Sequence, residues 1–366
     1  MKKADNFLVI ITCVFFLTLG VLFFILPKKS FSSAENRALT PAPSLTADSV
    51  GTGKYMTDFA KWYADTFPGR DFFVSLKAYS ELLQGKCENN GVLRLSDRLI
   101  PLPKENDLNT LKSNLRAISD FRDSVEIPVT VCAIPRVCDA YSYLLPSFYP
   151  TKENDELFIA FFDYSSGFSF NTCDVRKTLY SGDYYYKTDH HYTTDGAFAV
   201  YSQLSSSLGY EPYSLDDFER VRICDDFCGT SMRTSGMYLE DKDEIYLYRY
   251  NGDEDYEVVC DDKTGGLYDF SALGKTDKYS VFLGGNHARV DISAPEEREN
   301  ILIVRDSFAD SLSPFLSRNY DLTLIDLRYY KSSVKELVKN GEYKSVLVLM
   351  SITALEENSG LQYLYK

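Results

Sequence analysis

The sequence predicts an α/β fold, a doubly wound parallel sheet with helices on both faces. In the C-terminal third, short continuous apolar runs alternate with amphipathic helical patterns, as is typical of parallel strands covered on both sides. A helical pattern followed by an apolar run also occurs near residue 130. Roughly 310 residues follow the N-terminal segments, which is enough for one large domain.

The first 29 residues hold an uncharged run, Phe7 to Leu26, with lysines on both sides. At about 1.5 Å per residue, a helix of this length spans the roughly 30 Å hydrocarbon core of a bilayer. We therefore expect residues 1–29 to form a single-pass transmembrane anchor. A cleaved signal peptide is the alternative, but its apolar region is usually about 7–15 residues long. Because the bulk of the chain follows the anchor, an extracytoplasmic main domain is favoured.

Composition narrows the function further. Residues 30–50 are rich in Ser, Pro, Ala and Thr, which is typical of a tether, and residues 51–366 then form the main domain. The formal net charge is −14 and the pI is about 4.8, so we expect no nucleic-acid partner. Seven of the eight cysteines follow the apolar run at spacings that suit no zinc finger. They are interpreted as thiols, one or two pairs of which could form disulfides.

The helices and strands can be placed in order. Aromatic residues at helical spacing on both sides of Phe67-Pro-Gly-Arg70 predict two packed helices. A further helix is expected at 108–121, leading into a buried strand at 127–134. The later pattern predicts strand 301–304, helix 307–318, strand 322–327, helix 332–339 and strand 345–350.

A β-rich insertion is expected at about residues 210–282. Within it, the runs 245–250 and 253–260 flank Asn251-Gly252, which predicts a β-hairpin because a type I′ turn needs positive φ at both central residues. The acidic residues around it lack the spacing of a calcium-binding loop and are interpreted as a solvated face.

Chemistry is expected where the histidines lie. The chain has three, His190 and His191 in one segment and His287 in another, and histidine is the side chain best suited to proton transfer near neutral pH. Asp189 stands two residues before His191, so an extended segment would put both side chains on one side. The alternative is that these residues cap the helix predicted after Thr193 or pair locally.

Ser307 stands where the strand at 301–304 turns into a helix, at the carboxyl edge of the sheet. Backbone N–H groups and the helix dipole can stabilise an oxyanion there. A serine at such a turn can also be a simple N-cap. The Asp-His segment favours a nucleophile, because nucleophilic serine chemistry needs a base and an acid that orients the base.

The segment Thr188-Asp-His-His-Tyr192 resembles the signature of the bacterial DHHW family, with Tyr192 where the family name has Trp. Further matching blocks are Glu35-Asn-Arg-Ala-Leu39, Phe67-Pro-Gly-Arg70, Asp226-Phe-Cys-Gly-Thr230, Leu283-Gly-Gly-Asn286, Asp306-Ser307 with Pro314-Phe-Leu316, and Ile325-Asp-Leu-Arg328-Tyr. The family is in turn similar to SGNH-hydrolase-like proteins that O-acetylate alginate and other exported polysaccharides. The resemblance therefore implies an SGNH-like sheet.

The resemblance implies roles for particular residues. Ser307 would be the nucleophile, His191 the general base and Asp189 its orienting partner, with His190 the variable residue between them. The sequence departs from ordinary SGNH enzymes in having no Gly-Asp-Ser around Ser307.

It also implies contacts around the nucleophile. The oxyanion donors would be the backbone N–H at Ser307 and groups from a neighbouring loop, where Gly285 and Asn286 are candidates. Arg328, at the end of the next strand, would contact the substrate or brace the nucleophile turn through Asp306.

We therefore expect a membrane-anchored serine acyltransferase or acetylesterase that acts on a cell-surface or exported polysaccharide. The expected partners are the polysaccharide acceptor and a membrane-bound O-acyltransferase as acyl donor, with no cofactor and no metal. One alternative is a non-catalytic polysaccharide-binding or assembly component with a vestigial triad. Another is a metal site on Asp-His-His as in the DHH phosphoesterases, which use several further Asp motifs that have no counterpart here.

Overall fold

The structure is a computed structural model that describes residues 2–32, 37–103, 105–147, 149, 152–357 and 360–364. The chain folds as two units. One comprises Met1–Asn90 with Met232–Tyr238, and the other comprises Gly91–Ser231 with Leu239–Lys366.

The first unit begins with helix α1 (Lys2–Ile25), whose stretch Asp5–Ile25 has a mean hydropathy of 3.0 and is long enough to cross a membrane. The helix predicted over the uncharged run is thus confirmed, and a membrane anchor and a signal sequence both fit its length and composition. The segment expected as a tether contains an antiparallel pair, β1 (Phe31–Ser32) with β2 (Arg37–Ala38), and helix α2 (Ala47–Gly51). Residues 33–36, which include part of a block matched to the family, lie outside the described residues.

The two helices predicted around Phe67-Pro-Gly-Arg70 are α3 (Lys54–Thr66) and α4 (Arg70–Leu83). Gly69, with φ +71°, precedes α4 and allows the chain to turn between them. Strand β3 (Glu88–Asn89) follows. No α3 side chain is fully buried in the structure, although the helical pattern is amphipathic.

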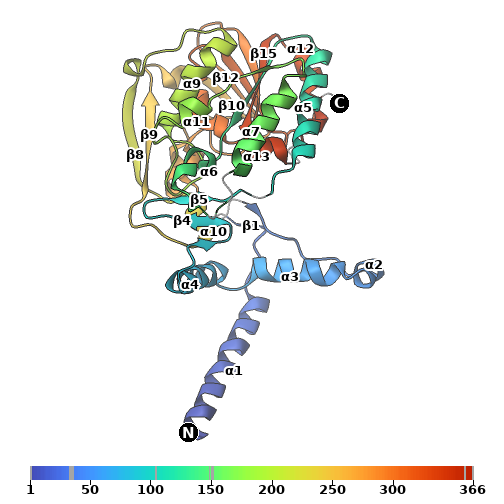
Figure 1. Cartoon of the computed structure of the whole chain (residues 1–366), viewed down its shortest axis with the longest axis vertical. Coiled ribbons are helices and arrows are strands. Elements are labelled where there is room, and N and C mark those ends of the chain that lie inside the picture. Colours follow the sequence, from blue (N-terminus) through green and yellow to red (C-terminus); the bar gives the residue numbers. More distant parts are fainter. Residues whose placement is uncertain are drawn as a thin grey trace. The chain divides into compact units, whose positions relative to one another are not determined.

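The second unit is built on an eight-stranded sheet (Figure 1) in the order β11-β10-β12-β14-β13-β15-β6-β7. The strands are β6 (Val129–Ile134), β7 (Asn171–Thr172), β10 (Glu257–Cys260), β11 (Lys263–Thr264), β12 (Arg289–Ser293), β13 (Asn300–Arg305), β14 (Asp321–Ile325) and β15 (Tyr343–Ser351). The five strands from β14 to β7 are parallel, as predicted, but β12, β10 and β11 are antiparallel. The prediction of a wholly parallel sheet was wrong: the sheet is mixed. Only six residues separate β12 from β13, too few for the crossover that a parallel pair requires.

Helices cover both faces of this sheet, as predicted. One face carries α6 (Val137–Ala140), α9 (Thr194–Leu208) and α11 (Phe308–Leu316), and the other carries α5 (Leu108–Val125), α7 (Lys152–Ser165), α12 (Val334–Asn340) and α13 (Ile352–Glu356). In β13, Ile301 and Ile303 belong to the core on the α9 side, while Leu302 and Val304 belong to the core on the α5 side. This alternation explains why the strand is apolar at every position.

The prediction of a β-hairpin at Asn251-Gly252 was also wrong. β9 (Asp243–Arg249) pairs with β8 (Glu219–Phe227) in a separate two-stranded sheet, whereas β10 joins the main sheet. Gly252 does turn the chain, with φ +90°. The two-residue hairpin turn lies instead at Asp261 and Asp262, both with positive φ, and joins β10 to β11. Alternation and an Asn-Gly pair indicate strands and a turn, but the choice of partner depends on which core each strand joins.

The remaining elements of the second unit are β4 (Val92–Arg94), β5 (Leu99–Pro101) and α8 (Arg176–Leu179), and α10 (Thr230–Ser235) runs across the boundary between the units. All eight cysteines are free thiols.

Candidate active site

Ser307 lies in the turn between β13 and α11, at the carboxyl ends of the parallel strands. The carboxylate of Asp306 accepts hydrogen bonds from the N–H groups of Phe308, at 3.1 Å, and Ser351, at 2.7 Å. Asp306 therefore accepts a hydrogen bond from a backbone N–H in the first turn of α11 and connects this turn to the end of β15. The Ser307 hydroxyl makes no capping bond, so the capping alternative for this serine does not describe its side chain.

His191 bridges Ser307 and Asp189. Its Nε2 lies 2.7 Å from Ser307 Oγ, and its Nδ1 lies 2.6 Å from Asp189 Oδ1. All three side chains belong to the second unit, and those of Asp189 and His191 are buried. The helix that follows is capped by Thr193, whose side chain accepts from the N–H of Gly196, so Asp189 and the histidines do not serve as its cap.

Asp189 is held by a second segment of the chain. Its Oδ2 accepts from the backbone N–H of Thr230 at 2.6 Å and from the Thr230 hydroxyl at 2.9 Å. Burial disfavours the carboxylate, but the positive charge available on His190 and His191 and these donated hydrogen bonds hold the pKa of Asp189 well below its usual range. Asp189 is thus kept as an anion beside His191.

Gly229 allows the 226–230 segment to approach so closely. A Cβ atom on Gly229 would lie 2.2 Å from the Cβ of Asp189 and 2.5 Å from the carbonyl oxygen of Thr188. Only glycine fits there without displacing the backbone. This close approach explains why glycine stands at position 229 in the block Asp226 to Thr230.

Asp243, which sequence reasoning missed, anchors the start of the His-His segment. Its carboxylate accepts from the N–H groups of Lys187 and Thr188, each at 2.8 Å, and from the Thr188 hydroxyl at 2.5 Å. Burial raises the pKa of Asp243 although these donors oppose the shift. Nothing in the local pattern distinguishes this aspartate from the other acidic residues around it.

Two tyrosines contact the His191 segment and helix α11. The ring of Tyr279 stacks on the imidazole of His191, with centroids 3.9 Å apart and planes 9° apart, and its hydroxyl lies 3.0 Å from Ser311 Oγ. Tyr192 donates from its hydroxyl to the carbonyl oxygen of Phe308 at 2.5 Å. The residue that replaces the family's Trp therefore ties the segment to α11. Tyr279 belongs to none of the motifs, so no sequence signal indicated it.

The other expected site residues are held by local partners. Gly285 donates its N–H to the carbonyl oxygen of Phe282 at 3.3 Å, and Asn286 Oδ1 lies 3.4 Å from a guanidinium nitrogen of Arg328. Neither Gly285 nor Asn286 lines the cavity described next. Arg328 does line it, but its guanidinium binds Asp326 at 2.6 Å.

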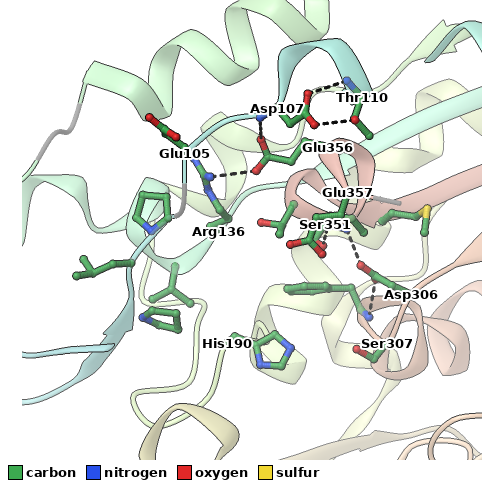
Figure 2. Close-up of a pocket in the computed structure, with 18 of the residues that line it drawn as sticks. Glu105, Asp107, Thr110, Arg136, His190, Asp306, Ser307, Ser351, Glu356 and Glu357 are labelled. Atoms are coloured by element: carbon green, nitrogen blue, oxygen red, sulfur yellow. Dashed lines mark hydrogen bonds and ion pairs between the residues drawn. The ribbon is translucent and has the colours of Figure 1, made fainter. Parts of the chain in front are cut away.

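A cavity of about 840 Å³ opens beside the nucleophile (Figure 2). Ser307 and His190 lie at one end of the view, and Glu105, Asp107 and Glu356 at the other. Its lining is Pro101, Leu102, Pro103, Glu105, Asp107, Thr110, Arg136, Val137, His190, Asp306, Ser307, Phe308, Arg328, Met350, Ser351, Thr353, Ala354, Glu356 and Glu357. This volume lies in the usual range for small-molecule sites, roughly 300–1,000 Å³.

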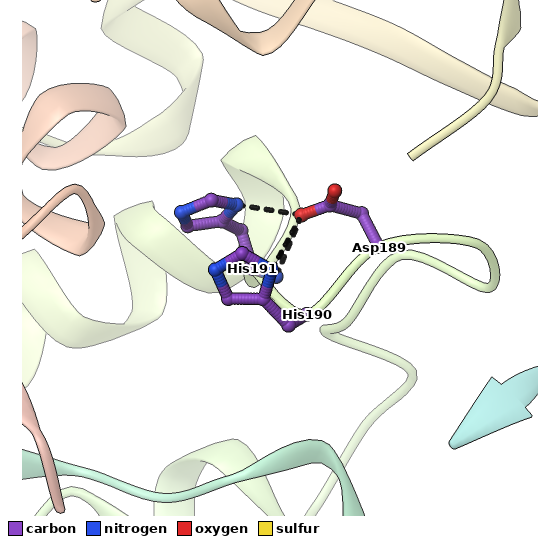
Figure 3. Close-up of side chains that lie close together, drawn as sticks. All are labelled: Asp189, His190 and His191. Carbon is purple, nitrogen blue, oxygen red and sulfur yellow. Dashed lines mark hydrogen bonds and ion pairs between the residues drawn. The ribbon is translucent and has the colours of Figure 1, made fainter. Parts of the chain in front are cut away.

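Asp189, His190 and His191 also form the one group in the described residues with metal-ligand chemistry, their ligand atoms lying within 4.8 Å of one another (Figure 3). Two ligands of one tetrahedral zinc, each about 2.0–2.1 Å from the metal, lie about 3.3 Å apart. The 2.6 Å separation of His191 Nδ1 and Asp189 Oδ1 is that of a hydrogen bond, and His190 Nδ1 faces Thr230 Oγ1 at 2.7 Å. The arrangement fits a hydrogen-bonded pair better than a metal site.

Solved structures with a similar fold include a DHHW family protein from Eubacterium siraeum, 19% identical, with a TM-score of 0.63 over 75% of this chain and 95% of that chain. Bacillus cereus PatB1, solved with a sulfonyl adduct, is 18% identical, with a TM-score of 0.65 over 75% and 98%. The O-acetyltransferase domain of Pseudomonas putida AlgJ is more distant, 13% identical, with a TM-score of 0.47 over 74% and 93%.

No curated protein sequence matches the chain. The family model described as DHHW protein matches residues 170–325, a range that contains Asp189, His191 and Ser307. This match agrees with the resemblance found in the motifs. Residues 170–325 are therefore similar to the family of DHHW proteins.

Proposed function

We propose that this chain is a membrane-anchored, extracytoplasmic serine acyltransferase or acetylesterase with an SGNH-like fold, acting on a cell-surface or exported polysaccharide. The observation that carries the proposal is the position of His191, within hydrogen-bond distance of both the Ser307 hydroxyl and the Asp189 carboxylate. A nucleophilic serine requires this relation of base and orienting acid.

In the first step, Ser307 Oγ attacks the carbonyl carbon of an acyl donor while His191 Nε2 takes the hydroxyl proton. Asp189 accepts from His191 Nδ1–H and stabilises the imidazolium that forms. The backbone N–H of Ser307, at the N-terminus of α11, is a donor for the developing oxyanion. The leaving group then takes the proton from His191, which leaves an ester on Ser307.

In the second step, a sugar hydroxyl or water gives its proton to His191 and attacks the ester carbonyl. The bond from the carbonyl carbon to Ser307 Oγ then breaks, and His191 returns the proton to Ser307. Transferase and esterase differ only in this acceptor. The cavity beside Ser307 is large enough to hold part of a polysaccharide, which favours a sugar acceptor.

The likeness to PatB1 supports a nucleophilic site on this fold, because that protein was solved with a sulfonyl adduct and sulfonyl reagents react with activated hydroxyl groups. The motif resemblance to polysaccharide O-acetyltransferases supports acetyl as the acyl group. Acetyl-CoA is not available outside the cytoplasm, so a membrane-bound O-acyltransferase would supply the acetyl group. Helix α1 would then keep this chain beside its donor.

The test is covalent labelling of the purified full-length chain, in detergent micelles, with a fluorophosphonate probe. Wild-type protein should gain one probe, and peptide mass spectrometry should find it on Ser307. The Ser307→Ala variant should not be labelled, with Ser206→Ala, at an exposed serine of α9 outside the cavity, as the control that still reacts. A folded wild-type protein that resists the probe and hydrolyses no acyl ester would instead support the non-catalytic polysaccharide-binding component.

A further inference from the structure

The cavity beside Ser307 has a strongly acidic wall. Among the described residues that line it, five carry carboxylates and two carry guanidinium groups. The carboxylates are Glu105, Asp107, Asp306, Glu356 and Glu357, and the guanidinium groups are Arg136 and Arg328. An acceptor that enters the cavity therefore meets more carboxylates than guanidinium groups.

Neither arginine leaves a surplus of positive charge. Arg136 binds Asp139 at 3.0 Å and Glu356 at 3.6 Å, so two carboxylates share one cation. The Arg328 guanidinium is bound by the buried carboxylate of Asp326. An anionic ligand would have to compete with these internal partners for either cation.

Carboxylates also line the rest of the cavity. Hydrogen bonds from the backbone N–H and the hydroxyl of Thr110 lower the pKa of Asp107. Glu105 and Glu357 are exposed. Burial raises the pKa of Glu356, which is also paired with Arg136. Asp107 and the two exposed glutamates therefore present the carboxylates that a ligand meets. Figure 2 shows Glu357 between Ser307 and Glu356.

We infer that this cavity selects an acceptor glycan whose bound segment carries no negative charge, an uncharged or amine-bearing sugar rather than a uronic-acid or phosphate-bearing one. The inference rests on the proposed function, since it names the acceptor of the same site. A carboxylate on each sugar would lie within about one Debye length, roughly 8 Å at physiological salt, of several carboxylates on the wall. Neutral sugars can accept and donate hydrogen bonds there without this repulsion.

The experiment compares three pentasaccharides of matched length, made of N-acetylglucosamine, glucosamine or mannuronic acid. Binding to the full-length Ser307→Ala variant is measured by titration calorimetry at low salt, so that the result does not depend on turnover. Transfer from p-nitrophenyl acetate to each pentamer by wild-type protein is measured separately by mass spectrometry. The uronate pentamer should bind at least about tenfold more weakly than the N-acetylglucosamine pentamer. In about 0.5 M salt this difference in affinity should become smaller, because salt screens the repulsion between carboxylates.

Substitutions of the cavity glutamates test which side chains weaken the binding of the uronate pentamer. Glu105→Gln combined with Glu357→Gln, in the Ser307→Ala background, should raise the affinity for the uronate pentamer relative to the neutral one by about fivefold. Glu342→Gln, which removes an exposed glutamate that does not line the cavity, should leave the ratio unchanged.

Equal binding of the uronate and neutral pentamers, no binding of any pentamer, or an unchanged ratio in the double variant would each overturn the inference. If the charge preference holds but wild-type protein neither hydrolyses nor transfers acetyl, then the proposed chemistry fails and the charge selectivity of the cavity stands.

Discussion

At the scale of single residues, the site depends on one carboxylate with four short contacts. Asp189 accepts from the backbone N–H of His191 at 3.0 Å, the His191 ring and two groups of Thr230. Because both of its oxygens are occupied, the carboxylate cannot rotate, and it holds His191 Nδ1 as the protonated nitrogen. The other nitrogen, Nε2, is then the acceptor that faces Ser307.

Ser307→Ala and His191→Ala should each abolish hydrolysis of p-nitrophenyl acetate. Asp189→Asn should lower kcat by about 10³–10⁴, because the amide favours the wrong imidazole tautomer. His190→Ala should be milder, since its ring faces the cavity and Thr230 rather than Ser307 Oγ. Circular dichroism and the melting temperature check folding, and wild-type turnover by folded Ser307→Ala would refute the nucleophile.

Tyr279 should act as a positioning residue for His191. Tyr279→Phe keeps the stacked ring and should lower kcat by only a few-fold. Tyr279→Leu removes the stack and should lower kcat by at least about tenfold with KM for p-nitrophenyl acetate little changed, since the imidazole loses the surface that orients it. Equal kcat values for the Tyr279→Leu variant and the wild type would show that stacking on Tyr279 does not position His191.

At the scale of elements, the 226–230 segment supports the triad only because it passes so close to Asp189. Gly229→Ala should push this segment away, since the new Cβ would meet Asp189 atoms at 2.2 Å and 2.6 Å. The Thr230 hydrogen bonds would then lengthen. We expect a loss of activity comparable to that of Asp189→Asn and a lower melting temperature.

The matched control for that change is Gly274→Ala. A Cβ on Gly274 meets nothing within 4 Å, so its effect on the free energy of unfolding should stay within about 0.5 kcal/mol. If the two glycine variants behave alike, close packing at Gly229 does not support the site.

A buried ion pair joins strand β13 to helix α11, between Arg305 and Asp310 at 2.6 Å. Burial raises the pKa of Asp310 to about 7, against the attraction of Arg305. The folded state therefore binds this proton more tightly than the unfolded state, whose aspartate has a pKa near 3.8. The contribution of Asp310 to the free energy of unfolding is full below pH 3.8, the pKa of the unfolded aspartate, and is lost as the pH rises through about 7.

Asp310→Asn removes this titration. The stability of wild type relative to Asp310→Asn should therefore fall between pH 5 and pH 8, as measured by urea unfolding at each pH. A relative stability that rises over this range would contradict the raised pKa.

At the scale of the whole molecule, the N-terminal helix allows the proposed membrane anchor to be tested. If α1 is an uncleaved anchor, the protein from its native host should stay in the membrane fraction after alkaline carbonate washing and keep its full length. An apolar helix of 21 residues is held in the bilayer by the hydrophobic effect, which carbonate does not weaken. A shortened soluble form starting near residue 33 would identify a cleaved signal instead.

In the second unit, the sequence by itself predicted the helix at 108–121, the strand at 127–134 and the alternating strands and helices at 301–350, but not α7, β7 or β12. Strands such as β13 and β15 are buried on both faces, and the helices between them have one apolar face, so local periodicity is sufficient to find them. Asp189, His191 and Ser307 were predicted as a set because the family resemblance and the strand-to-helix turn both pointed to them.

Only the tertiary structure decided which strands pair and what supports the site. β10 joins the main sheet and β9 a separate one because their apolar residues belong to different cores, which local alternation does not encode. Asp243 and Tyr279 are distant from Ser307 in the chain and carry no local pattern, and Thr230 stands in a matched block whose contact with Asp189 only the structure reveals. They reach the triad through the packing of distant segments, because hydrogen bonds and ring stacking depend on spatial distance and not on sequence separation.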